Sequence, residues 1–299
     1  NNTKDLQEFY PTSVLITGND ILFFWVARMI LMGKYLTGKV PFKETFVHGL
    51  IYGKSYWREK DSLRIYVSTK EQKEFDKGAP LPKDVQGKWE KMSKSKGNVI
   101  DPIDIIEDYG TDAMRFALAS SLNHLGQIDL DQRRFEDSRN FINKIWNSAR
   151  FVFFSTEDLQ FSSGIDWSLC TFEDHWILQE VDQLIEKNPQ HLHTYSYEKA
   201  ANLLQDFYWK TFSSTYLEST KPYLKNPSTP SLKENKQKLL TILLFALVRL
   251  FHPFIPLVTE ELLSHIQERF FKMDPKNEPY ALEFQEALKK KACILTNYP

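Results

Sequence analysis

The chain has 299 residues, a formal net charge of −1 and 42% hydrophobic residues, so we expect a soluble protein with two or three well-packed domains. Two cysteines, Cys170 and Cys293, are too few for a disulfide framework and lack zinc-knuckle spacing, which predicts free thiols and no structural metal. The longest apolar run, residues 239–251, is too short to cross a bilayer and contains Arg249, so it predicts a buried helix.

The first predicted elements are a strand and a helix. Residues 13–17 form a β-branched run that ends at Gly18, and residues 20–32 have helical character. This is the pattern of half a Rossmann unit, in which ligands bind at the carboxyl ends of the strands. Asp20 would lie at that edge, where its carboxylate can accept hydrogen bonds from ribose hydroxyls. An N-cap role for Asp20 is also compatible with the pattern.

Residues 46–48 predict a second strand, which ends at His48 and is followed by Gly49. If the two strands are neighbours, Gly49 lies at the same edge as Gly18 and Asp20. Its backbone, which carries no side chain, can then lie against an adenine ring.

The most informative stretch is the loop at residues 91–98, with the sequence KMSKSKGN. It combines two cations, two short hydroxyl donors and a residue that permits close backbone approach: Lys91, Lys94, Ser93, Ser95 and Gly97. Such a set can stabilise the charge that develops on a transferring phosphorus, so the loop indicates an ATP site. A solvated basic turn before a helix is the alternative interpretation.

The pentapeptide KMSKS is the second hallmark of class I aminoacyl-tRNA synthetases, and the chain resembles that family at this point. Further segments resemble its valine-specific branch in the same order: YPTSVLITGNDILFFWVARMI, PFKETFVHGLI, GNVIDPIDIIEDYGTDAMRFALA, NKIWNSARFV and HPFIPLVTEEL. An isoleucine or leucine enzyme would share the lysine loop, but the apolar residues of NDILFFWVARM favour valine.

The resemblance implies roles for individual residues. Lys91 and Lys94 would be catalytic, because they stabilise the phosphates during amino-acid activation. Trp25 would form a wall of the amino-acid pocket, although an aromatic residue in FFWV is more often part of a core. The implied ATP-binding residues are Gly18, Asp20, His48, Gly49, Lys91, Met92, Ser93, Lys94 and Ser95.

The implied reaction is in-line attack of the valine carboxylate on the α-phosphorus of ATP, followed by transfer of the acyl group to tRNA(Val). The partners are therefore valine, ATP and tRNA(Val), and Mg²⁺ is expected to arrive with ATP rather than to occupy a protein cage. No membrane is involved. A cytoplasmic location follows, with a monomer expected for the full enzyme.

Class I enzymes also carry an HxGH motif, and none of the seven histidines here lies in such a pattern. We therefore expect an internal fragment that lacks the HxGH half, the editing domain and the C-terminal coiled coil. Such a fragment would be inactive alone. An alternative function for the isolated fragment is that of a tRNA-binding module without catalytic activity.

The segment at residues 53–88 is the main departure from the family pattern, in which a short hairpin joins HGL to KMSKS. It is rich in Lys, Glu, Asp and Pro, and its LRIYVST stretch predicts an extra strand. An exposed insertion at a loop tip is the simplest interpretation. If this insertion affects catalysis, we expect it to do so through the movement of the lysine loop.

The sequence becomes helical at Asp101, a predicted cap that is followed by Pro102 at the first helical position. Tyr109 and Gly110 close this helix, and Thr111 or Asp112 is expected to cap the next. The helix after these joins the catalytic core to the anticodon domain in the family.

Residues 139–154 predict a helix with Asn147, Arg150 and Phe151 at spacings of three and four. Asparagine can read base edges, arginine can bind phosphate, and phenylalanine can stack on an unpaired base. By resemblance, these three residues and Arg133 are the expected tRNA contacts. The alternative is that the aromatic side chains are core residues.

The remaining sequence predicts four helices around one core, at residues 174–187, 196–221, 232–252 and 257–271, broken by Pro189, Pro222, Pro253 and Pro256. Residues 293–297 are expected to be extended. The fold class is α/β plus all-α: a partial Rossmann-like parallel sheet, a helical linker and a helical anticodon-binding bundle. The expected domains are residues 1–106, 107–165 and 166–299.

Overall fold

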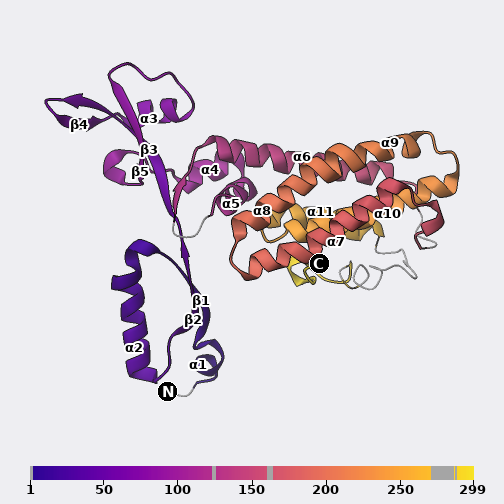
Figure 1. The fold of residues 1–299 in the computed structure, drawn as a ribbon, viewed down its shortest axis with the longest axis horizontal. Coiled ribbons are helices and arrows are strands. Elements are labelled where there is room, and N and C mark those ends of the chain that lie inside the picture. The colour runs from indigo at the N-terminus through magenta and orange to yellow at the C-terminus, as the bar shows by residue number, and fades with distance from the viewer. Residues whose placement is uncertain (1–2, 123–125, 160–163, 271–285, 287) are drawn as a thin grey trace. The chain divides into compact units, whose positions relative to one another are not determined.

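The computed structural model describes residues 3–122, 126–159, 164–270, 286 and 288–299. The chain divides into two compact units, which are described separately below. Unit 1 contains residues 1–101 and 121–134, and unit 2 contains residues 102–120 and 135–299. One unit carries the sheets and the other is helical, which confirms the predicted α/β plus all-α class (Figure 1). The finer division at residues 106 and 165 stays a prediction.

Unit 1 begins with a two-stranded parallel sheet. Strands β1 (Thr12–Gly18) and β2 (Phe42–His48) pair so that Gly18 lies opposite His48, which confirms the two predicted strands. The other elements of this part are α1 (Lys4–Phe9), a 3₁₀ turn (Asn19–Ile21), a π-helix (Leu22–Val26) and α2 (Ala27–Thr37).

The helix expected over residues 20–32 is therefore wrong at its start. Regular α-helical geometry begins only at Ala27. The preceding turn is wound as a π-helix, and Phe23, Phe24 and Trp25 on it are exposed. Wider turns of this kind cannot be read from apolar spacing, and they are frequent at functional sites.

The second sheet of unit 1 is built around β3 (Leu50–Lys60). Strands β4 (Leu63–Tyr66) and β5 (Val85–Lys91) lie antiparallel on either side of β3, and β6 (Gln127–Asp129) pairs with it in parallel. Helix α3 (Thr69–Asp76) follows β4. β4 confirms the extra strand predicted within LRIYVST. Because β5 ends at Lys91, this sheet delivers the lysine loop directly.

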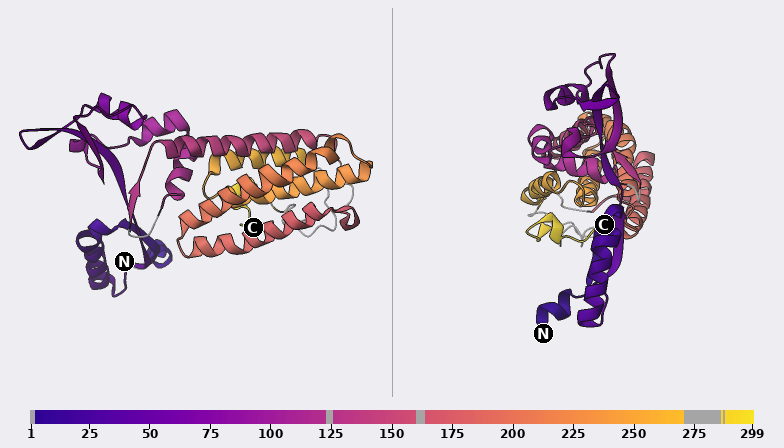
Figure 2. Two further views of the ribbon diagram at one scale, coloured as in Figure 1. Left: turned by 45° about the horizontal axis from the view of Figure 1, so that its top comes forward. Right: turned by 90° about the vertical axis from the view of Figure 1, so that its left-hand side faces the viewer.

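Unit 2 is helical, and its long helices run alongside one another (Figures 1 and 2). Its elements are α4 (Pro102–Tyr109), α5 (Thr111–Ala119), α6 (Arg133–Ser155, whose first two residues belong to unit 1), a turn (Trp167–Leu169), α7 (Phe172–His193), α8 (Tyr197–Asp206), a π-helix (Phe207–Tyr216), α9 (Leu217–Lys225), α10 (Pro230–Phe251), α11 (Pro256–Phe270) and a final turn (Cys293–Leu295).

Phe141 of α6 lies at the centre of the core of unit 2 and is fully buried. Its ring centroid is 5.2 Å from that of Phe116, 5.9 Å from that of Tyr208 and 5.8 Å from that of Phe251. Four elements thus meet at one aromatic cluster, which confirms the predicted single core. The whole of α10 from residue 235 to 251 is buried, as its apolar run predicts.

Three predictions of local structure are wrong. Pro189 and Pro222 lie inside α7 and α9 and do not break them, because tertiary packing holds each helix on both sides of the proline. The cap of α5 is Gly110, whose φ of 92° suits glycine, rather than Thr111 or Asp112. The tail at residues 293–297 begins with a 3₁₀ turn instead of extended chain.

Asp112 caps a different helix. Its carboxylate accepts hydrogen bonds from the backbone N–H groups of Leu257 (3.3 Å) and Val258 (2.7 Å), at the start of α11. These donors have no intrahelical partner in the first turn, so the carboxylate satisfies them. A cap supplied from 145 residues away in the sequence leaves no local signal.

No helix in the described ranges is long and apolar enough to span a membrane. Both cysteines are free thiols, with Cys293 buried and Cys170 half-buried. Burial raises the pKa of Cys293 to about 12, so this thiol stays protonated at neutral pH.

A buried ion pair lies inside unit 2. Lys236 of α10 and Asp174 of α7 are almost fully buried, with Nζ and Oδ2 2.5 Å apart. Lys236 also donates to the hydroxyl of Thr171 at 2.7 Å, and the hydroxyl of Tyr216 donates to Asp174 at 2.8 Å. Each charge is therefore hydrogen-bonded as well as paired, which is the condition for a buried pair to be tolerated.

The substitution Lys236→Met removes one partner and leaves the carboxylate of Asp174 buried without its counter-ion. We expect the free energy of unfolding of unit 2 to fall by about 3–5 kcal/mol. Urea denaturation of the chain followed by circular dichroism measures this change. The matched control is Lys233→Met, on the same helix, where the ion pair with the exposed Asp158 lies at the surface. It should cost at most about 1 kcal/mol, and equal losses for the two variants would contradict the assignment.

Candidate functional site

The edge where β1 and β2 end forms the base of the candidate site in unit 1. Gly18 ends β1 opposite His48, and Asp20 follows in the 3₁₀ turn. A Cβ atom at Gly18 would lie 2.8 Å from Oδ1 of Asp20 and 3.0 Å from Cδ2 of Leu50. Only glycine therefore fits here without displacing the carboxylate of Asp20.

Lys91, the first lysine of the loop, lies against this edge. Its Nζ is 2.5 Å from Oδ2 of Asp20, although the two residues are 71 positions apart. The hydrogen bond from Lys91 lowers the pKa of Asp20 and outweighs the opposing effect of burial. Both side chains remain open to solvent, at 56% and 36% exposure, so a ligand can reach them. The structure thus brings together two predicted ATP-binding residues from separate motifs.

The side chain of Asn98 connects the start of the loop to strands β3 and β5. It is buried, and its Oδ1 accepts the N–H of Ser93 at 2.8 Å. Its Nδ2 donates to the carbonyl oxygens of Gly53 and Glu90, both at 3.2 Å. The sequence alone did not identify Asn98 as a functional residue, although it is the last residue of the KMSKSKGN motif.

Gly53 and Gly97 allow the loop to adopt this shape. A Cβ atom at Gly53 would lie 2.2 Å from the carbonyl oxygen of Asn98, so β3 and the end of the loop approach each other as closely as glycine permits. Gly97 has a φ of 69° and its N–H donates to the carbonyl of Lys94 at 3.2 Å. These two positions require glycine for different reasons, one for space and one for backbone conformation.

The three lysines of the loop differ in their partners. Lys91 pairs with Asp20, and Nζ of Lys96 lies 3.1 Å from Oε2 of Glu90. Lys94 is exposed and forms no ion pair with any residue that the structure describes. The hydroxyls of Ser93 and Ser95 are 2.8 Å apart, within hydrogen-bonding distance of each other. Lys94 is therefore the cation that an incoming anion meets without displacing a carboxylate.

The other predicted residues of this unit include His48, Trp25 and Met92. Nδ1 of His48 is 2.8 Å from the carbonyl oxygen of Gly49. A carbonyl can only accept, so Nδ1 carries the proton and donates. Trp25 lies on the π-helix and is 48% exposed, so it is not part of a core within the described residues. Met92 is half-buried in the loop.

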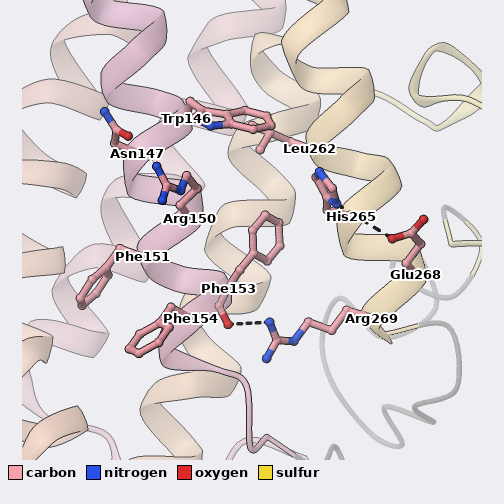
Figure 3. Close-up of a pocket in the computed structure, with 10 residues that line it drawn as sticks. All are labelled: Trp146, Asn147, Arg150, Phe151, Phe153, Phe154, Leu262, His265, Glu268 and Arg269. Atoms are coloured by element: carbon pink, nitrogen blue, oxygen red, sulfur yellow. Dashed lines mark hydrogen bonds and ion pairs between the residues drawn. The ribbon is translucent and has the colours of Figure 1, made fainter.

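In unit 2, α6 and α11 line an open cavity of about 920 Å³. Figure 3 shows Trp146 and Phe153 directed toward α11, where His265 lies, while Phe151 points away from α11. Arg269 donates to the carbonyl of Phe153 at 2.5 Å and so ties the two helices together. The lining residues are Trp146, Asn147, Arg150, Phe151, Phe153, Phe154, Leu262, His265, Glu268 and Arg269.

Three of the four predicted tRNA contacts, Asn147, Arg150 and Phe151, therefore share one cavity. The ring of Phe151 also lies under Nζ of Lys221, 5.5 Å from its centroid. Arg133 is not among the lining residues, and its guanidinium forms an ion pair with Asp131 at 2.7 Å. Within the described chain, no cluster of three or more His, Cys, Asp and Glu side chains is placed to bind a metal ion.

Comparison with known proteins agrees with this geometry. Residues 1–63 and 80–131 match the family of tRNA synthetases class I (I, L, M and V), and residues 174–299 match the anticodon-binding domain of tRNA ligase. A parallel edge with a lysine loop, followed by a helical bundle, is the architecture of a class I synthetase. The chain belongs to the class I tRNA synthetase family.

Within that family the chain is similar to valine–tRNA ligases. The one from Protochlamydia amoebophila (strain UWE25) is 48% identical over 99% of this chain and 33% of its own length. The one from Chlamydia trachomatis serovar L2 is 43% identical over 100% of this chain and 32% of its own length. The chain thus spans about a third of the length of the curated relatives it matches.

Solved structures show the same fold at lower identity. The Mycobacterium tuberculosis methionyl-tRNA synthetase bound by methionyl-adenylate is 17% identical, with a TM-score of 0.62 over 87% of this chain and 45% of that chain. The Agrobacterium radiobacter K84 agnB2 LeuRS in a ternary complex with tRNA and LeuAMS is 19% identical, with a TM-score of 0.57 over 86% of this chain and 28% of that chain.

The contact between Lys91 and Asp20 predicts a titration behaviour. Because the folded-state pKa of Asp20 is lowered, the ion pair is present above the ordinary carboxyl pKa and is lost as the pH falls through the lowered value. In Lys91→Met the pKa of Asp20 should rise back toward its ordinary value. NMR titration of ¹³C-labelled aspartate measures it. Lys94→Met is the control and should leave Asp20 unchanged, whereas equal effects of both variants would show that the pair does not form in solution.

Proposed function

We propose that the chain is part of an ATP-dependent ligase that activates valine as valyl-adenylate and transfers it to tRNA(Val). The observation that carries this proposal is the contact between Lys91 and Asp20, because it supports a single site in which the KMSKS loop faces the edge that we propose binds the ribose. The identity of 48% to a valine–tRNA ligase supports the choice of valine over isoleucine or leucine. The similarity of the whole chain to such ligases also supports a cytoplasmic location.

In the proposed activation step, the carboxylate of valine attacks the α-phosphorus of ATP in line and pyrophosphate leaves. Lys94 and Lys91 stabilise the charge on the phosphates, and Asp20 accepts hydrogen bonds from the ribose. The valine carboxylate is already a nucleophile, so no side chain needs to act as a general base. Catalysis then consists of positioning and charge stabilisation. Mg²⁺ would arrive with ATP and share the phosphate charge, and we assign no residue to it.

The remaining site residues have supporting roles in this proposal. Gly18 and Gly49 let the nucleotide approach the backbone, and His48 presents its free Nε2 edge beside them. Met92, Ser93 and Ser95 shape the loop around the phosphates. Trp25 forms one wall of the valine pocket, and its exposure on the π-helix leaves its indole available for that contact.

For tRNA(Val), we propose that Asn147, Arg150 and Phe151 contact the anticodon from the surface of α6, with Arg133 binding phosphate nearby in the sequence. The cavity between α6 and α11 supports this role because it combines apolar rings with an amide and a guanidinium. Unpaired bases are recognised by stacking and edge hydrogen bonds of this kind. The boundaries at residues 106 and 165 divide the catalytic part, the linker and the anticodon-binding bundle in this proposal.

The role of Lys94 is tested by valine-dependent ATP–pyrophosphate exchange on the natural polypeptide that contains this chain. We expect Lys94→Ala to lower the exchange rate about 10²- to 10³-fold, because one preorganised cation is lost from the transition state. Lys70→Ala, an exposed lysine on α3, is the matched control and should exchange normally. Activity of Lys94→Ala equal to that of the control would refute the proposed chemistry. Exchange with isoleucine or leucine alone would reassign the substrate.

The proposed RNA face is tested by filter binding of tRNA(Val) to the chain. Phe151→Ala should weaken binding about 10-fold, because a stacked base loses its aromatic partner. Phe172→Ala is the matched control, since Phe172 is 82% exposed on α7 away from the cavity. Tight tRNA binding without any exchange activity would support a tRNA-binding module in place of a ligase. Equal affinity for both variants would remove α6 from the interface.

A further inference from the structure

The inserted segment of unit 1 reaches the residue directly before the lysine loop through a side chain. The match to the class I family leaves out residues 64–79, which hold most of β4 and all of α3. These elements pack on β3 and β5, the hairpin whose second strand runs into the loop at Lys91. The composition of the segment suggests an exposed insertion at a loop tip, but the segment instead packs on the hairpin.

Helix α3 covers one face of the hairpin. Its Gln72 is buried and donates from Nε2 to the carbonyl of Lys54 at 2.7 Å. Phe75 packs against Tyr56, with ring centroids 5.1 Å apart. Arg58 of β3 joins Glu71 of α3 at 2.8 Å and Asp84, just before β5, at 3.0 Å.

Arg64 of β4 crosses the opposite face. Its guanidinium lies over the buried ring of Trp57, 4.4 Å from the centroid, which fixes the direction of the side chain. NH1 of Arg64 then reaches Oε1 of Glu90 on β5 at 3.6 Å. The segment thus contacts both faces of the hairpin. On the face that carries Arg64, it contacts Glu90, the residue directly before the loop.

Glu90 holds the loop at two points. Its backbone carbonyl accepts from Asn98, the last residue of the loop, and its carboxylate lies 3.1 Å from Nζ of Lys96. Its side chain is only 15% exposed. Burial alone would raise the pKa of Glu90, but Lys96, followed by Ser55 and then Arg64, outweighs it and the pKa is lowered. Glu90 is thus a carboxylate held in its charged form between two cations.

We propose that Glu90 is a positioning residue that keeps the loop at residues 91–98 in its folded conformation by holding Lys96, and that Arg64 of the inserted segment secures Glu90 in place. Lys96 is then a tether, whereas Lys91 and Lys94 are the cations that face phosphate. The consequence for ATP rests on the proposed function. A loop that is already ordered loses less conformational entropy when the nucleotide binds.

The proposal is tested first without any ligand. Hydrogen–deuterium exchange of the peptide spanning the loop should become about 3- to 10-fold faster in Glu90→Gln and in Arg64→Met. Lys70→Met, in the same inserted segment, is the matched control and should exchange as the unmodified chain does. Arg64→Lys keeps a cation at this position and should restore part of the protection. Unchanged exchange in both Glu90→Gln and Arg64→Met would overturn the proposal.

The second arm measures kinetics on the natural polypeptide. The KM for ATP in pyrophosphate exchange should rise about 3- to 10-fold in both variants, with kcat and the KM for valine little changed. The double variant should be no worse than Glu90→Gln alone, because the two residues act in one chain of contacts. A lower KM for ATP would overturn the proposal, since it would mean that Glu90 withholds Lys96 from the phosphates.

The two failures are distinguishable. If the unmodified protein shows no valine-dependent exchange, the proposed function falls, while the hydrogen-exchange arm still decides whether Glu90 and Arg64 order the loop. If the unmodified protein is active and the two variants match it in both arms, only the positioning role falls. Thermal unfolding of each variant checks that a faster exchange is confined to the loop.

Discussion

The ion pair between Lys91 and Asp20 is the contact on which the candidate site depends, because it joins the edge of the parallel sheet to the loop that follows the antiparallel sheet. The parallel sheet presents Gly18, Asp20 and His48 at one edge, and the antiparallel hairpin delivers the loop. Neither sheet alone holds both the carboxylate of Asp20 and the lysines of the loop. Because Gly18 has no Cβ atom, the carboxylate of Asp20 can lie close beside it, so the contact depends on local space as well as on charge.

In the helical unit, the core fixes the long helix α6, while part of the surface of α6 stays open at the cavity. α10 is buried along most of its length. Its Lys236 forms a buried ion pair with Asp174 of α7, and each of the two charged groups also forms a hydrogen bond with a neighbouring hydroxyl. Phe141 anchors α6 to this interior. Further along α6, Asn147 and Arg150 are exposed and line the cavity.

Much of this arrangement could be predicted from the sequence, and the remainder has identifiable physical reasons. Strands, loop and bundle follow from apolar periodicity and from the lysine motif, all of which are local signals. The contacts of Asp112 with Val258, of Asn98 with Gly53 and of Glu90 with Arg64 are not local, since each joins segments that meet only in the folded chain. Pro189 also escaped prediction, because packing overrides a propensity that holds for isolated helices.

The charges of the loop explain how it can be both ordered and ready for a ligand. Three lysines within six residues repel one another, and Asp20 and Glu90 neutralise two of them in the structure. A ligand that carries phosphate but no ribose would pair with Lys91 and leave the carboxylate of Asp20 without its counter-ion. A ligand that also offers ribose hydroxyls replaces both halves of the pair at once, so neither charge loses its partner. On the proposed function, the contact therefore favours a nucleotide over free pyrophosphate, which is the selectivity that the release of pyrophosphate requires.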